Sequence, residues 1–378
     1  MKKKCYIVFA SVFCLFLVLS LSLIGCTSAS SAKIYEITMG NMSPMESSMN
    51  RVVNQSWINW LEKESNGRLK ITLMPAAQAA APDKFYDAAK DGLIDIGDQH
   101  MGMVAGRFPL MSVLDLPLII QFPGSRSGAL TCMALYEKYP EIQNEFKDVK
   151  VLNFHFGGIG HLHTTKKPVK TMEDINGMVI LTVGKGASDQ IKALGGSPEP
   201  GNPTQIYDLL AKGSVDGMSL NFEGAHGVFH ITEITNYATV VGFSDVPFVN
   251  VMNLNTWNSL PSDIQKLFTG DNAKRISELY GFDFDQSDLA NRDALDKTLK
   301  DRGYPGVYTL PNAELSRWEQ ALLPLREKWV SSVAASVGEA KARAILEDAI
   351  KFAKQNEYST TPFDKLRQTL HDWGAPGY

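Results

Sequence analysis

The sequence predicts an α/β protein built from two similar lobes with a cleft between them. Three observations support this prediction. A strand pattern and a helical pattern alternate at the start of the folded body, a short segment of that region recurs later in the chain, and the last third is mostly helical in pattern. The chain has 378 residues, of which 44% are hydrophobic and 21% charged, which is enough for two domains with hydrophobic cores.

The first residues have the pattern of an export signal. Three lysines precede the uncharged run CYIVFASVFCLFLVLSLSLIG, and the segment LIGC that ends at Cys26 resembles a bacterial lipobox. In a lipobox the Cys is acylated and everything before it is removed. We therefore expect a lipoprotein signal peptide at 1–25, lipid attachment at Cys26 and a short polar tether at 26–33. An uncleaved anchor is the alternative, because the uncharged run is long enough to span a bilayer.

Charge and cysteine content exclude two classes of protein. Cleavage after residue 25 removes three lysines and no acid, so the formal net charge moves from −4 to −7. A mildly acidic exported protein is not a nucleic-acid binder. Of the four cysteines only Cys132 remains in the folded body, so no disulfide framework is expected. Its helical surroundings, GALTCMALYEKY, favour a buried structural residue over a nucleophile.

The folded body opens with a strand, a helix and a second strand. KIYEITMG (33–40) alternates as a strand does, and apolar residues recur at helical spacing over 43–67. An Asn-Gly pair at 66–67 supplies a helix stop, and RLKITLMP (68–75) has the pattern of the next strand. This order is the βαβ unit from which parallel α/β sheets are built.

An internal repeat indicates that a second lobe has the same construction. FYDAAKDGLIDIGD (85–98) aligns without gaps with IYDLLAKGSVDGMS (206–219). In each copy an amphipathic helix stops at a Gly that is free to take positive φ, and a short strand follows. The Asp before each strand, Asp95 and Asp216, is interpreted as a structural residue that fixes the turn.

Two extended segments are candidate crossings between the lobes. KVLNFHFGGIGHLHTT (150–165) is a strand that runs into a Gly-rich bend, and VVGFSDVPFVNVMNLNTW (240–257) is a second long extended run. After them the pattern is helical. A two-lobed protein with two hinge strands has a cleft between its lobes, and such clefts bind small molecules.

Four blocks carry a resemblance to a known family. They are AGRFPLMSVLDLPLI (105–119), KKPVKTMEDINGM (166–178), IKALGGSPEPGNPTQIYDLLAKGSVDG (191–217) and NLNTWNSLPSDIQK (253–266). In these blocks and their order, the chain resembles the extracytoplasmic solute-binding proteins of tripartite ATP-independent periplasmic (TRAP) transporters. The similarity covers nearly the whole chain after the leader.

The resemblance implies a two-lobed, periplasmic-binding-protein-like fold with a cleft, hinge strands and a long helix that braces both lobes. The expected boundaries are 34–152 with about 246–275 for lobe I, 153–245 with about 300–378 for lobe II, and about 262–300 for the bracing helix. The lobes close on a small organic ligand, and the loaded protein docks on membrane permease subunits. We expect a monomer without a cofactor.

The stretch GMVILTVG (177–184) departs from the family pattern. Where the family usually has an Arg that binds the ligand's carboxylate, this chain has Leu181. The resemblance also places Gly160 at a second family Arg, Leu220 at a family Asn, and Gly242 with Phe243 at a later polar pair. Burying a carboxylate without a partner abolishes useful affinity. The ligand is therefore expected to be more apolar or less anionic than a C4-dicarboxylate, unless a relocated Arg such as Arg51 or Arg107 supplies the charge.

Polar and methionine-rich segments at strand ends supply further candidates. Gln99, His100 and Met101 follow the strand of the first repeat copy, and the loop at 42–45 follows the first strand. Both lie where open α/β sheets bind ligands. The methionines are either an adaptable pocket lining or core filler.

Two histidines and a glutamate complete the candidates. His161 and His163 alternate along an extended segment and so point the same way. No third ligand of matching spacing is evident, so hydrogen bonding is expected in place of a metal site. Glu223 follows the second repeat copy and is either a partner for a cationic or hydroxyl-bearing ligand or a solvated loop carboxylate. The full set of candidate ligand-binding residues is Leu181, Gln99, His100, Met101, His161, His163, Leu220, Glu223 and Phe243.

The sequence therefore predicts an exported solute-binding protein and not an enzyme. It contains no Gly-x-Ser-x-Gly elbow, His-Glu-x-x-His helix or Walker loop. We expect lipid anchoring on the outer side of the cytoplasmic membrane or in the periplasm, and delivery of the ligand to a TRAP-type transporter. A lipid-anchored ligand sensor for a signalling partner has the same fold and cleft, and an exported hydrolase is the alternative from another class.

Overall fold

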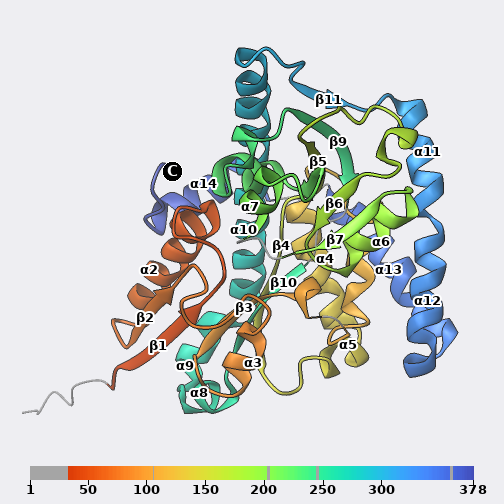
Figure 1. The fold of residues 1–378 in the computed structure, drawn as a ribbon. Coiled ribbons are helices and arrows are strands. Elements are labelled where there is room, and N and C mark those ends of the chain that lie inside the picture. The colour runs from red at the N-terminus through yellow and green to blue at the C-terminus, as the bar shows by residue number, and fades with distance from the viewer. Residues whose placement is uncertain (1–32, 105, 202–204, 244–246, 358–360) are drawn as a thin grey trace, which may run out of the picture. The chain divides into compact units, whose positions relative to one another are not determined.

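A computed structural model describes residues 33–104, 106–201, 205–243, 247–357 and 361–378. In this part of the chain two β-sheets are surrounded by helices (Figure 1), which confirms the predicted α/β class. The predicted signal peptide and Cys26 lie outside the described residues. None of the described helices is long and apolar enough to cross a membrane.

The two sheets have a related construction. In order across the sheet, the first contains β2 (Leu69–Met74), β1 (Tyr35–Gly40), β3 (Ile96–His100), β10 (Pro247–Met252) and β4 (Lys150–Phe156). The second contains β11 (Val307–Thr309), β9 (Tyr237–Phe243), β5 (Gly160–Thr164), β8 (Gly217–Leu220), β6 (Val179–Thr182) and β7 (Ser197–Pro200). In each sheet three parallel strands are followed by an antiparallel strand, β10 in the first and β5 in the second.

Helices of very different length cover the sheets. They are α2 (Gln55–Glu64), α3 (Phe85–Lys90), α4 (Ser125–Lys138), α5 (Pro140–Asn144), α6 (Lys185–Ala193), α7 (Ile206–Ala211), α8 (Leu254–Ser259), α9 (Ser262–Gln265), α10 (Asp271–Asp301), α11 (Asn312–Leu322), α12 (Pro324–Val337), α13 (Glu339–Glu357) and α14 (Phe363–Asp372). Two short π-helical segments, η1 (Met49–Asn54) and η6 (Glu223–Val228), border the site described below.

The repeat found in the sequence corresponds to equivalent elements of the two sheets. Helix α3 precedes β3 and helix α7 precedes β8, and the glycines that end them have φ of 77° at Gly92 and 69° at Gly213. The two Asp residues hold the neighbouring parallel strand in each sheet. Asp95 accepts hydrogen bonds from the backbone N–H and hydroxyl of Thr38, at 2.8 and 2.9 Å, and Asp216 accepts one from the Val179 N–H at 2.9 Å. Both residues therefore have a structural role, but through the neighbouring strand and not through the turn that the sequence analysis assigned to them.

The chain crosses between the sheets at the two predicted hinge strands. Strand β4 lies in the first sheet and β5, three residues later, lies in the second. Strands β9 and β10 make the opposite crossing, through residues 244–246, which lie outside the described part. Gly157, Gly158 and Gly160 of the first crossing line the cavity described below.

The longest helix, α10, has 31 residues and contacts elements of both sheets (Figure 1). Asp285 on α10 accepts hydrogen bonds from the backbone N–H groups of Ser125 (2.8 Å) and Arg126 (3.2 Å), at the N-terminus of α4. Asp288, one turn later, accepts one from the Glu223 N–H (2.8 Å) at the start of η6. Helix α10 therefore caps one helix on each side of the molecule.

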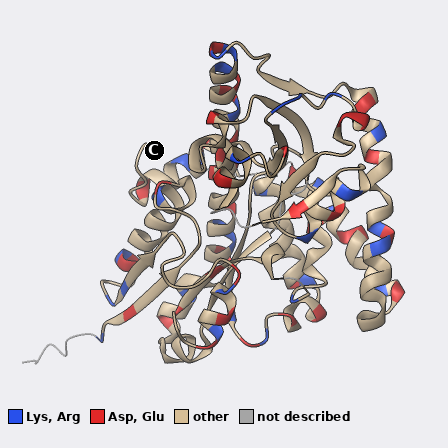
Figure 2. Ribbon diagram, viewed as in Figure 1, with Lys and Arg blue, Asp and Glu red and all other residues tan. Residues whose placement is uncertain are grey.

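The helices after α10 divide between the two sheets. Trp318 and Leu322 of α11 pack in the hydrophobic core of the second sheet. Helices α12 and α13 instead contribute to the core under the first sheet, and α14 packs on the other face of that sheet. Positively and negatively charged side chains are interspersed along the outer helices α11 and α12 (Figure 2). The lobe boundaries inferred from the sequence stay a prediction.

Loss of the α4 cap should destabilise the whole fold. We expect Asp285→Ala to lower the free energy of unfolding by about 2–4 kcal/mol, because two backbone N–H groups lose their acceptor. Asp285→Asn keeps an acceptor oxygen and should lose less. Urea unfolding followed by circular dichroism measures both.

The matched control is Asp293→Ala, an exposed position on the same helix. It should change the free energy of unfolding by no more than about 0.5 kcal/mol. Equal losses at positions 285 and 293 would contradict the capping role.

Candidate functional site

A cavity of about 110 Å³ lies where strand ends of both sheets, the first crossing segment and α10 meet. Its walls are formed by Met42, Ser43, Ser47, Met49, His100, Gly157, Gly158, Gly160, Val183, Ala187, Ser219, Leu220, Asn221, Glu223, Gly224, Val228, Phe229, Phe248 and Phe284. The volume suits a small organic molecule of about one ring. The position matches the rule that open α/β sheets bind ligands at the carboxyl ends of their strands.

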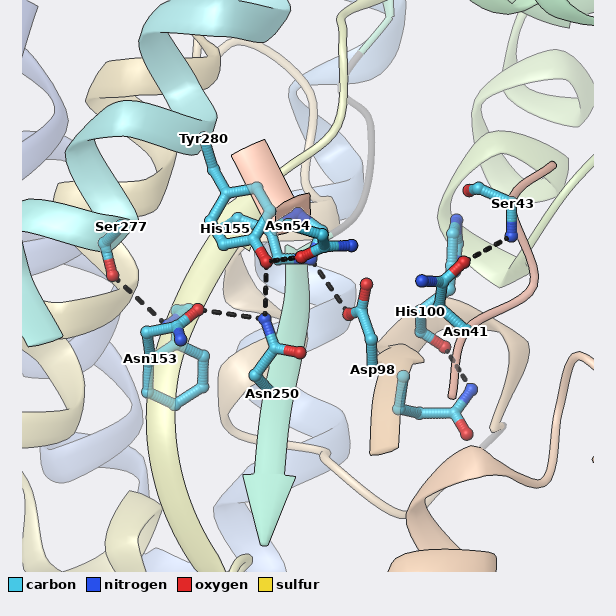
Figure 3. Close-up of polar contacts among 12 residues, drawn as sticks. Asn41, Ser43, Asn54, Asp98, His100, Asn153, His155, Asn250, Ser277 and Tyr280 are labelled. Atoms are coloured by element: carbon cyan, nitrogen blue, oxygen red, sulfur yellow. Dashed lines mark hydrogen bonds and ion pairs between the residues drawn. The ribbon is translucent and has the colours of Figure 1, made fainter. Parts of the chain in front are cut away.

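The aromatic wall of the cavity rests on a buried histidine. The His155 ring stacks on Phe248, with centroids 4.6 Å apart and an interplanar angle of 16°, and lies parallel to Phe284 at 6.1 Å. Tyr280 stacks on His155 at 4.4 Å. The His155 Nε2 contacts Asp98 Oδ1 at 2.9 Å, as Figure 3 shows. This stack fixes the orientation of the two phenylalanines.

Buried asparagines hold the loop that forms the opposite side of the cavity. Asn50 donates to Asn41 Oδ1 at 3.1 Å and to the Ser43 carbonyl at 2.8 Å. The Ser43 N–H in turn donates to Asn41 Oδ1 at 3.0 Å, as Figure 3 shows. The Tyr280 hydroxyl donates to Asn54, one turn further along. These asparagines were not predicted from the sequence. The pattern that could have indicated them is the four-residue spacing of Asn50 and Asn54 in the segment after the first strand.

Glu223 brings a carboxylate to the wall. Its Oε1 accepts a hydrogen bond from the Ser48 N–H at 3.0 Å, and its side chain is 5% exposed. The side chains of Asp283 and Asp288, from α10, are 2% and 1% exposed. In the described part of the chain Asp283 Oδ2 and Asp288 Oδ2 have no hydrogen-bond partner. The site thus carries three buried carboxyl groups.

Burial raises the pKa of each of these carboxyl groups. It raises the pKa of Asp283 to about 7, and repulsion from Glu223 adds to that shift. Burial likewise raises the pKa of Asp288 well above its ordinary range and raises the pKa of Glu223, which hydrogen bonds from Ser48 partly offset. The charge of exposed Arg51 acts in the opposite direction on Glu223 and Asp283.

Three of the nine candidate residues line the cavity: His100, Leu220 and Glu223. His100 is buried, which lowers its pKa to about 4 and makes it neutral at neutral pH. Its Nδ1 has no hydrogen-bond partner among the described residues. Asn221, the neighbour of Leu220, also lines the cavity and was not singled out from the sequence. The ligand-binding roles of these residues stay predictions.

The two candidates nearest to His100 do not line the cavity. Gln99 is buried and accepts a hydrogen bond from the Tyr86 N–H at 3.0 Å, while its Nε2 donates to the Pro82 and His100 carbonyls. Met101 packs in the core of the first sheet and borders a separate groove of about 630 Å³. Both therefore have packing partners of their own.

The remaining candidates are buried away from the cavity. His161 packs against Phe222 at 4.4 Å, and its Nδ1 accepts from the Val241 and Gly242 N–H groups at 3.4 Å. His163 Nε2 lies 3.0 Å from the Leu220 carbonyl. Leu181 and Phe243 pack in two different apolar clusters of the second sheet. No group of three or more His, Cys, Asp or Glu in the described residues is arranged to hold a metal ion.

No Lys or Arg lines the cavity in the part of the chain that the structure describes. Arg107 lies 4.0 Å over the Tyr86 ring and 3.4 Å from Asp87, so it belongs to the first sheet's surface. Arg51 is exposed on η1 and is not part of the wall. Among the described residues the cavity is therefore aromatic and polar, with one carboxyl group, one neutral histidine and no Lys or Arg.

Comparison with known proteins places this geometry in a family. The family model of bacterial extracellular solute-binding proteins, family 7, matches residues 39–332. The chain belongs to this family. It is thus an extracytoplasmic solute-binding protein of the TRAP type, with the two-lobed fold and hinge strands that the sequence predicted.

Three relatives illustrate the range of ligands in the family. A TRAP solute-binding protein from Rhodoferax ferrireducens, solved with copurified benzoate, is 25% identical, has a TM-score of 0.78 and covers 85% of this chain and 98% of its own. One from Bordetella bronchiseptica with bound mandelate is 25% identical, with a TM-score of 0.76 and 85% and 99% coverage. The C4-dicarboxylate-binding periplasmic protein DctP of Rhodobacter capsulatus is 23% identical over 72% of this chain and 80% of its own length.

The buried carboxyl group of Asp283 should make stability depend on pH. Its ordinary pKa is 3.8, and the folded protein raises it to about 7. The folded state therefore binds this proton more tightly than the unfolded state does. As the pH rises from about 4 to about 7, the unfolded state loses the proton first, and the free energy of unfolding falls. Asp283→Asn removes the loss. Relative to wild type, the variant should gain free energy of unfolding between about pH 4 and pH 8, by about 1.4 kcal/mol per unit of raised pKa.

Urea unfolding of both proteins across this pH range measures the effect. Asp293→Asn, on the exposed side of the same helix, is the matched control. A difference between Asp283→Asn and wild type that does not change with pH contradicts the assignment.

Proposed function

We propose that the cavity binds a small organic solute with an apolar or aromatic body and that it disfavours simple C4-dicarboxylates. The observation that carries this proposal is the composition of the wall: Phe229, Phe248 and Phe284 face the cavity, and no Lys or Arg does so among the described residues. A doubly charged ligand in such a site leaves both carboxylates without a cationic partner, which costs several kcal/mol.

The relatives with known ligands support the aromatic body. The Rhodoferax and Bordetella proteins hold benzoate and mandelate, which are single-ring acids. A ring of that size fits a cavity of about 110 Å³. The resemblance found in the sequence places Leu181 at the family position of the carboxylate-binding Arg, and Leu181 is fully buried in an apolar cluster. The ring is therefore shared with these relatives, whereas the anchoring of a carboxylate is not.

Binding between two lobes supports a delivery function. The cavity is formed by both sheets and by both sides of a hinge, so a ligand that contacts both favours the closed state. We infer that the protein is a monomer after processing and delivers its solute to the permease subunits of a TRAP transporter. We expect no catalytic activity.

A comparison of ring compounds with dicarboxylates tests the proposed ligand. Thermal unfolding of a protein that starts at residue 27 should shift upward with benzyl alcohol and not with succinate. A ligand at about 100 times its dissociation constant adds roughly 2.7 kcal/mol of stability. X-ray scattering of the loaded protein should show compaction. Micromolar affinity for succinate, or identical scattering curves at saturation, would contradict the proposal.

Two Phe→Leu variants on helices, one at the cavity wall and one on the surface, test which side chains form the wall. Phe284→Leu alters the cavity wall, so it should weaken binding of the ring compound. Phe363→Leu changes a side chain that is 54% exposed on α14 and should leave binding unchanged. Equal effects of the two variants would contradict the assignment of the wall.

We also propose that the protein is lipid-anchored through Cys26. The lipobox-like segment LIGC and the uncharged run before it support this proposal. Cys26→Ser should leave the protein either uncleaved or released from the membrane, because a hydroxyl is not processed as the thiol is. Phase partitioning in detergent, with mass determination of the mature chain, measures the change. A variant that partitions as the wild type does would contradict a lipid at this position.

A further inference from the structure

The carboxyl group of Glu223 has no Lys or Arg beside it among the described residues of the cavity wall. Resting on the proposed function, we propose that the ligand carries a protonated amino group that pairs with Glu223, while its apolar body lies against Phe248 and Phe284. The ligand class is thus an arylalkyl or alkyl ammonium compound and not an aromatic acid. Three independent features of the wall carry this inference.

The first feature is that Glu223 is held in place without a cation. Its Oε1 accepts a hydrogen bond from the Ser48 N–H at 3.0 Å, and its backbone N–H is bound by Asp288 Oδ1 at 2.8 Å. The first contact comes from η1, beside the first sheet, and the second from α10. The carboxylate is therefore oriented before any ligand enters, which lowers the entropic cost of binding.

The second feature is a pair of buried acids behind Glu223. Asp283 and Asp288 are both buried, each has a carboxylate oxygen without a hydrogen-bond partner among the described residues, and both interact electrostatically with Glu223. The charge of Arg51 reaches this group from an exposed position, and Ser287 and Tyr378 contribute neutral hydrogen bonds. Because no Lys or Arg of the described residues lines the wall, an ammonium group on the ligand would favour the ionised form of Glu223, whereas a carboxylate would be repelled by it.

The third feature is the aromatic wall. Phe248 and Phe284 lie parallel to the His155 ring, so their orientation is fixed by the stack. The face of an aromatic ring is negative and attracts ammonium groups. His100, which also lines the cavity, is kept neutral by burial and adds no positive charge. The Glu223 carboxylate and the faces of the aromatic rings thus both favour a positive charge on the ligand.

A charge series on one ring tests the inference with the unmodified protein. Benzylamine, benzyl alcohol and benzoate share the same body and differ in charge. Calorimetry at neutral pH should give at least about tenfold tighter binding for benzylamine than for benzyl alcohol, which matches a charge-assisted hydrogen bond, and the weakest binding for benzoate. Equal affinities for the amine and the alcohol would overturn the inference.

Glu223→Gln identifies the residue. The amide keeps an acceptor for the Ser48 N–H and removes the charge, so the affinity for benzylamine should fall to that for benzyl alcohol. Binding of benzyl alcohol, unchanged within about twofold, shows that the variant is folded. Glu233→Gln, an exposed carboxylate outside the cavity wall, is the matched control and should leave both affinities unchanged. Loss of benzylamine affinity in both variants, or in neither, would overturn the assignment to Glu223.

The outcomes separate this inference from the proposed function. If benzoate binds most tightly, the ammonium ligand is wrong and the aromatic body stands. If none of the three ring compounds binds and succinate does, both are wrong. Tighter binding of benzylamine that depends on Glu223 supports both.

Discussion

The arrangement of the site depends on one short stretch of the long helix α10. Within two turns, Asp285 caps α4 beside the first sheet, Asp288 caps η6 beside the second, and Phe284, the residue before Asp285, lines the cavity. The stretch lies close to α4, since a Cβ at Gly281 would fall 2.3 Å from the Arg126 Cα. A change in the angle of α10 would therefore move both halves of the wall together. Burial raises the pKa of Asp285 to about 6 and the pKa of Asp288 well above its ordinary range, so capping by buried carboxylates has an electrostatic cost.

The rest of the wall is fixed by polar groups in the first sheet. Asn153 and Asn250 pair across β4 and β10 at 3.0 Å, and the Asn250 Nδ2 lies 3.4 Å from the Tyr280 hydroxyl on α10 (Figure 3). Tyr280 also stacks on His155, which supports Phe248. Asn153 Nδ2, Asn250 Oδ1 and His155 Nδ1 have no hydrogen-bond partner among the described residues, so this polar layer is only partly satisfied. These contacts connect β4, β10 and α10 where they border the cavity.

Much of this architecture could be predicted because it is encoded locally. The βαβ pattern, the glycines at 92 and 213 and the paired roles of Asp95 and Asp216 depend on neighbouring residues and short spacings. His100 and Glu223 were selected because ligands bind at the carboxyl ends of the strands in open α/β sheets, and both residues line the cavity.

The sequence was least informative where side-chain direction decides the outcome. Alternation along a strand shows that His161 and His163 point to the same side, but not that this side faces Phe222 and not the cavity. Phe284 has no distinguishing pattern in a long amphipathic helix, so its place at the wall required the packing of α10. The buried asparagines were not predicted for the same reason, because their hydrogen-bond partners lie on other elements.

We propose that the cavity recognises a solute by its body and by a group that is not a carboxylate. The most direct measurement is a crystal structure of the protein with the ligand that copurifies with it. We expect a compound in contact with Phe248 and Phe284, with a nitrogen or hydroxyl group within hydrogen-bonding distance of Glu223. A ligand carboxylate bound by an arginine or lysine side chain would contradict it.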